Sequence, residues 1–209
     1  MNTEVKECAT DLTTDISELV VDSFLNDGLL KDIPIVGVGV KVIKLGTSIS
    51  DMILLNKLKI FMENINIVSE NDIEKFKEKM TNDKYRNDIG IKLLNIIDKI
   101  DEYAKIKWIA IVFLDYLDRN IDKDFFFRIT TIINDTFLQD IINLKVFEKK
   151  AEILSNNKVI ESYVLHQLFS HGLLDNAGMD GGFIEDNESE SGTIYTLNKF
   201  GDYILKKLL

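Results

Sequence analysis

One stretch of the sequence carries side chains of the type that bind calcium. From Asp118 to Asp124 acidic and amide residues alternate, as oxygen ligands do in an EF-hand loop. Such a loop needs Gly at its sixth position and Glu at its twelfth, and counting from Asp118 these positions hold Lys123 and Ile129. We therefore predict an acidic turn between two helices, in which Asp122 caps the second helix, and no metal site.

The other candidate groups for chemistry are two histidines and a set of carboxylates. His166 and His171 are five residues apart, whereas the zinc-binding HExxH pattern places two histidines four apart on one helical face. Asp98, Asp101 and Glu102 alternate with lysines, as on a solvated helix surface. The sequence therefore predicts no catalytic residue, no metal and no cofactor, and we expect a protein that is not an enzyme.

Residues 29–49 combine closely spaced glycines with many β-branched apolar residues. Gly37 and Gly39 lack the third glycine and the acidic partner of a dinucleotide-binding loop. Asp32 as N-cap and Pro34 in the first turn favour a helix with a small-residue face, although the alternating β-branched residues also suit a strand.

The same stretch is a possible interaction segment. Lys41 and Lys44 interrupt its apolar run, so it is not an ordinary membrane-spanning helix. We expect it to pack tightly in a soluble core, and the alternative is a membrane-perturbing effector that acts through residues 29–49. The residues at issue are Ile33, Pro34, Ile35, Val36, Gly37, Val38, Gly39 and Val40.

Charge and composition exclude several classes of function. The chain has 209 residues, with 25 Lys and Arg against 35 Asp and Glu, which gives a net charge of −10. An acidic protein repels phosphate, so nucleic acid and anionic lipid are disfavoured as direct partners. One Cys, two His and no secretory signal at the N-terminus favour a cytoplasmic protein with neither a zinc scaffold nor a disulfide framework.

Helical periodicity of apolar residues covers most of the first 154 residues. It predicts a multi-helix bundle, with a nearly all-apolar helix at 104–118 in its centre. The other predicted helices are 14–27, 50–66, 70–80, 84–102, 122–135 and 137–154.

The C-terminal region, 155–209, differs in character. Short helices over about 157–174 end near Gly172, and a polar loop, a strand at 193–197 and a last helix follow. This order predicts a small winged-helix-like α+β subdomain after the bundle. Its helix and loop are acidic rather than basic, which favours contact with protein over DNA. The possible interaction tail consists of His166, Gln167, His171 and Tyr195.

Several segments of the sequence also resemble parts of bacterial proteins. GLLKDIPIVG, SISDMILLNKLKIF and EYAKIKWIAIVFLDYLDRNIDKDFFFRIT resemble stretches of small bacterial proteins. The terminal GLL followed by YTLNKFGDYIL is similar to the end of abortive-infection-alpha-like proteins, which are linked to phage defence. The resemblance implies a helical, defence-associated bacterial protein and assigns no residue roles.

From these observations we expect a non-enzymatic interaction protein of a bacterial cytoplasm, with a protein partner or a homo-oligomer. A membrane-perturbing effector and a winged-helix transcriptional regulator are the alternatives.

Overall fold

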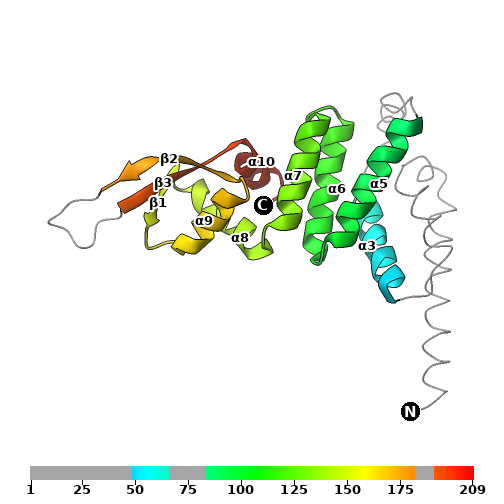
Figure 1. Cartoon of the computed structure of the whole chain (residues 1–209), viewed down its shortest axis with the longest axis horizontal. Helices are drawn as coiled ribbons and strands as arrows, with labels where there is room; N and C mark the ends of the chain where they lie inside the picture. Colours follow the sequence, from blue (N-terminus) through cyan, green and yellow to red (C-terminus); the bar gives the residue numbers. More distant parts are fainter. Residues whose placement is uncertain (1–48, 66–82, 182–190) are drawn as a thin grey trace, which may run out of the picture. The chain divides into compact units, whose positions relative to one another are not determined.

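A computed structural model describes residues 49–65, 83–181 and 191–209 of the chain (Figure 1). Contacts divide it into two compact units, Met1–Lys123 and Asp124–Leu209. Helices account for 65 % of the described residues, which confirms the prediction of a mostly helical protein. The possible interaction segment, Ile33–Val40, and the predicted helices 14–27 and 70–80 lie outside the described residues.

The first unit contains the helices α3 (Ile49–Ile65), α5 (Asp83–Lys99) and α6 (Tyr103–Leu117). Figure 1 shows α3 packed against both α5 and α6. The rings of Phe61 and Phe113 join α3 to α6, with their centroids 5.8 Å apart. Much of α6 is buried, as its nearly continuous apolar sequence predicts. Among the described residues of this unit, the fully buried large side chains include Phe61, Ile65, Ile89, Leu93, Ile97, Ile100, Ile106, Ile109 and Phe113.

Two lysines are buried among the residues that the structure describes in this unit, and each has an oxygen partner. The Nζ of Lys57 donates a hydrogen bond of 2.6 Å to the carbonyl oxygen of Asp98, in the last turn of α5. The Nζ of Lys105 lies 3.0 Å from a carboxylate oxygen of Glu102. A cation is favourable near unpaired carbonyls at a helix C-terminus, so Lys57 ties α3 to the end of α5.

The second unit begins with α7 (Lys123–Asp135), α8 (Leu138–Ile142) and the 3-10 helix η2 (Asn143–Glu148). It also contains α9 (Ser162–Ser170) and α10 (Lys199–Lys207). The ring of Phe125 in α7 lies 4.9 Å from Phe200 and 5.2 Å from Tyr203 of α10, measured between centroids. This aromatic packing joins α7 to α10, and both helices belong to the unit Asp124–Leu209. The domain boundary after residue 154 stays a prediction.

The strands of the second unit form a three-stranded antiparallel sheet in the order β1-β3-β2 (Figure 1). They are β1 (Glu152–Asn156), β2 (Leu174–Asp180) and β3 (Ser191–Leu197). In the central strand, Tyr195 stands opposite Ile153 of β1 and Asn176 of β2. Strand β3 confirms the predicted strand at 193–197, and α10 confirms the predicted terminal helix.

Two local predictions are wrong. The expected helix 137–154 ends early, because its last residues form β1, which bonds to β3. The expected loop after Gly172 begins with β2, whose polar residues pair with β3 despite a low strand propensity. In both places hydrogen bonding to a distant strand overrides the local sequence.

No helix among the described residues has both the length and the apolar character required to cross a bilayer.

Candidate functional site

A hydrogen-bonded turn precedes helix α9, and a glycine in the left-handed conformation follows it. Before it, the side-chain oxygen of Asn157 accepts hydrogen bonds from the backbone N–H groups of Val159 and Ile160, at 2.7 and 2.9 Å. The Nδ2 of Asn157 donates to the carbonyl of Leu154, at 2.7 Å, which joins this turn to β1. After the helix, Gly172 adopts a φ of +78°, a conformation that reverses the chain at a helix end. The predicted helix end near Gly172 is therefore confirmed.

The two sides of α9 differ in burial. Val164, Leu165 and Leu168 are buried within the unit. We call the opposite side the α9 face and define it by Tyr163, His166, Gln167 and Phe169, all of which are exposed. Tyr163 is 64 % exposed and Phe169 is 42 % exposed.

The buried ring of Tyr195 packs against two side chains of the α9 face. It lies on β3 and is 2 % exposed. The imidazole of His166 meets its ring edge-on, with the centroids 5.9 Å apart, and the ring of Phe169 is tilted against it at 5.7 Å. Since Tyr195 belongs to the central strand of the sheet, it holds these two side chains of α9 in place.

His171 is the C-cap residue of α9 and differs from the other predicted tail residues. Its Nδ1 is buried and has no hydrogen-bond partner among the described residues. The nearby Asp140 of α8 is 8 % exposed. Burial raises the pKa of Asp140 above its ordinary value of 3.8, and the charge interaction with His171 opposes this shift.

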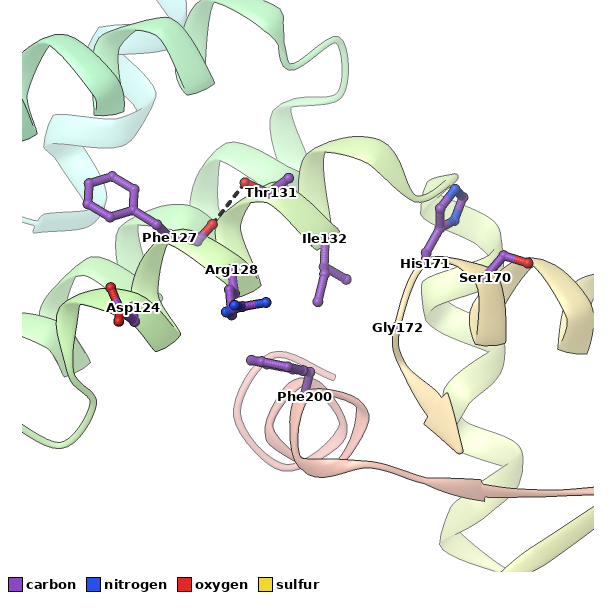
Figure 2. A pocket seen from close by; sticks show the side chains of 9 residues that line it. All are labelled: Asp124, Phe127, Arg128, Thr131, Ile132, Ser170, His171, Gly172 and Phe200. Atoms are coloured by element: carbon purple, nitrogen blue, oxygen red, sulfur yellow. Dashed lines mark hydrogen bonds between the residues drawn. The ribbon is translucent and has the colours of Figure 1, made fainter. Parts of the chain in front are cut away.

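A pocket of about 610 Å³ lies beside α7, the turn after α9 and the start of α10. Figure 2 shows Arg128 and Phe200 facing each other in this pocket, with Ile132 reaching into it from α7. The ammonium group of Lys199 lies 4.9 Å from the centroid of the Phe200 ring. The lining residues are Asp124, Phe127, Arg128, Thr131, Ile132, Ser170, His171, Gly172 and Phe200.

The hydroxyl of Thr131 in this pocket is bonded within its own helix. It donates to the carbonyl oxygen of Phe127, at 2.9 Å, as Figure 2 shows. Among the lining residues the structure describes, no hydroxyl is hydrogen-bonded to the imidazole of His171. A nucleophile activated by a base would need that bond.

The predicted tail residues are brought together in part. His166 and Tyr195 touch, Gln167 lies exposed on the next position of α9, and His171 lies at the end of the helix. Tyr163 and Phe169 were not among the residues predicted from the sequence. Tyr163 was predictable, because helical spacing places it opposite the apolar side of α9 that contains Val164, Leu165 and Leu168. Phe169 had no such signal, because it lies four residues after Leu165, at the edge of that apolar side.

The acidic turn at Asp118–Asp124 is a tight helix–helix connection. Arg119 adopts a φ of +61°, and the Nδ2 of Asn120 donates to a carboxylate oxygen of Asp115 at 3.2 Å. Within residues 49–65, 83–181 and 191–209, no group of three or more metal-binding side chains converges.

Comparison of the chain with protein-family models, curated proteins and solved structures found no significant match.

Proposed function

We propose that residues Asp124–Leu209 form a winged-helix-like module that binds another protein through the α9 face, without catalysing a reaction. The order of elements supports a winged-helix-like arrangement. A first strand precedes α9, a β2–β3 hairpin follows it, and α10 comes after the hairpin. The third strand lies between the other two, in the order β1-β3-β2.

The exposed aromatic character of the α9 face carries the proposal. A winged helix that reads DNA presents arginine, lysine or amide side chains from the corresponding helix to the bases and phosphates. Here α9 contains neither lysine nor arginine, and Tyr163 and Phe169 are exposed on it. Aromatic side chains are typical anchors of protein–protein interfaces, where they bury a large area at a small cost in conformational entropy.

The C-terminal segments resemble abortive-infection-alpha-like proteins, and this resemblance supports phage defence as the process in which the interaction takes place. On this proposal the protein is a cytoplasmic bacterial component that senses or regulates a second protein.

The experiment is site-specific photo-crosslinking in the bacterium that naturally makes the protein. Photoreactive p-benzoylphenylalanine replaces Tyr163 in the full chain, and the matched control replaces Ile91, which is 46 % exposed on α5. We expect a discrete adduct with one protein at position 163 and none at position 91. The second substitution Phe169→Ser should weaken the adduct, because both side chains belong to the proposed contact surface.

A parallel measurement tests the competing function. Binding of random duplex DNA to the purified protein should be undetectable at physiological salt, because phosphate contacts require basic side chains. Salt-sensitive DNA binding that is lost when the α9 face is substituted, together with no adduct at position 163, would refute the proposal.

A further inference from the structure

The pocket beside α7 is lined by two opposite charges and an apolar group in a row. Asp124, Arg128 and Ile132 follow one another at intervals of four residues, so they lie along one side of α7. Figure 2 shows the three side chains along this helix, on the side that faces Phe200. All of them belong to the unit Asp124–Leu209. A ligand in this pocket therefore meets a carboxylate, a guanidinium group and an apolar side chain in that order.

The two charged groups of the pocket are available to a ligand. Asp124 and Arg128 have a spacing at which opposite charges on a helix can pair. No ion pair joins them, however, and neither side chain has another charged or hydrogen-bonding partner among the described residues. Both side chains are exposed to solvent. A ligand with a positive and a negative group of its own can satisfy both of them.

The apolar wall opposite these charges is held in place from outside the pocket. The ring of Phe200 packs on that of Phe125, at 4.9 Å, and the ammonium group of Lys199 lies 4.9 Å from its centroid. Asn198 accepts a hydrogen bond from the N–H of Phe200 and donates one to the carbonyl oxygen of Gly172, at 2.9 and 2.7 Å. Gly172 also lines the pocket, so Asn198 fixes two of its walls. Walls that are already fixed lose little conformational freedom when a ligand binds.

We propose that this pocket binds a free α-amino acid with a large apolar side chain, such as phenylalanine or leucine. The α-carboxylate pairs with Arg128, whose planar guanidinium group donates two parallel hydrogen bonds to a carboxylate. The α-ammonium group pairs with Asp124, and the apolar side chain lies between Ile132 and Phe200. The volume of about 610 Å³ is within the range of pockets that bind small organic molecules. The site shares no residue with the α9 face and goes beyond the protein-binding function proposed above.

The presence of both charges favours a zwitterion over a simple anion. A nucleotide or another phosphate would pair with Arg128 but would place its negative charge beside the carboxylate of Asp124, and like charges repel. The net charge of −10 on the whole chain adds to this repulsion. An α-amino acid has no net charge and holds its two opposite charges on neighbouring groups, so it pairs with both side chains of the pocket.

The test titrates the isotope-labelled full-length protein with phenylalanine and with two analogues, and follows the amide signals by NMR. Phenylalaninamide lacks the carboxylate, and hydrocinnamate lacks the ammonium group. For an exposed site and a ligand of about 12 non-hydrogen atoms, we expect phenylalanine to bind with a dissociation constant on the order of 1 mM. Each analogue should bind about tenfold more weakly, because one charged group of the pocket then has no partner. Shifts of the Gly172 and Phe200 amides localise the ligand.

Variants connect each charge of the ligand to its partner in the pocket. Arg128→Gln and Asp124→Asn should each weaken the binding of phenylalanine about tenfold. Hydrocinnamate should bind Asp124→Asn at least as well as the original protein, because it has no ammonium group and the repelling carboxylate is gone. A general disturbance of the fold does not produce these opposite effects. The control Lys145→Gln removes a positive charge from an exposed residue of η2 outside the pocket, and it should change neither affinity.

Four outcomes overturn the amino-acid site. They are no binding of phenylalanine up to about 10 mM, hydrocinnamate binding as tightly as phenylalanine, binding that Arg128→Gln or Asp124→Asn leaves unchanged, and shifts only at amides away from Gly172 and Phe200. None of them bears on crosslinking through Tyr163. The amino-acid site and the protein-binding function therefore succeed or fail independently.

Discussion

Asn198 joins three elements of the second unit through a single side chain. Its Oδ1 accepts hydrogen bonds from the backbone N–H groups of Phe200 and Gly201, at 2.9 and 3.1 Å, and so caps α10. Its Nδ2 donates to the carbonyl oxygen of Gly172, at 2.7 Å, and lies 3.5 Å from that of Leu174. The turn after α9, the start of β2 and the start of α10 therefore all depend on one amide group.

The cost of removing this group follows from the bonds that it makes. Replacing an N-cap residue by alanine costs about 1 kcal/mol of stability. A lost hydrogen bond to a partly buried carbonyl costs about another 1 kcal/mol. We expect Asn198→Ala to lower the free energy of unfolding by about 2 kcal/mol. Asn198→Ser keeps a capping oxygen but has no amide donor, so it should lose about half as much.

The assay is chemical denaturation followed by far-UV circular dichroism, with hydrogen exchange of the α10 amides to localise the loss. The midpoint should fall while the dependence on denaturant stays unchanged, because the substitution alters stability and not the buried area. Asn95→Ala is the matched control, since Asn95 is exposed within helix α5. The reasoning is refuted if Asn198→Ala is as stable as the original protein, or if the alanine and serine variants lose equal stability.

Three further substitutions test other contacts. Gly201→Ala should cost about 1–3 kcal/mol in the same denaturation assay, since the added methyl group would overlap the carbonyl oxygen of Leu173; an unchanged midpoint would contradict this close approach. Lys57→Met keeps the buried stem but removes the donor to the carbonyl of Asp98, and a loss of about 1–3 kcal/mol should appear in the melting of the first unit. Burial raises the pKa of Asp140 above 3.8, so its contribution to stability is greatest below that pH and is lost as pH rises through the raised pKa. Asp140→Asn should therefore gain stability relative to the original protein as the pH rises above about 4, and a difference that does not vary with pH would refute this assignment.

The repeating spacing of apolar residues was sufficient to identify most of the helices. The predicted helices 50–66, 84–102 and 104–118 correspond to α3, α5 and α6, each shifted by no more than a few residues. The sequence also predicted the end of α9 near Gly172 and the strand at 193–197. A glycine after an apolar helix and a short β-branched and aromatic run are both local signals.

The exposure of the aromatic side chains of α9 could be predicted only in part from the sequence. The spacing of Val164, Leu165 and Leu168 defines which side of α9 is buried, so it also places Tyr163 outside. The sequence could not show that His166 and Phe169 rest on Tyr195, since that contact joins α9 to a strand more than 25 residues later in the chain.

The tertiary structure alone decided the sheet and the grouping of α7 with the C-terminal elements. The residues of β1 continue a helical pattern, and those of β2 include Asp, Asn and Gly, which disfavour strands. Both become strands because β3 offers them backbone partners, and α7 joins them because Phe125 packs on Phe200 and Tyr203. Helix hydrogen bonds close within four residues and leave a periodic pattern, whereas strand pairing and ring packing depend on residues far apart in the chain.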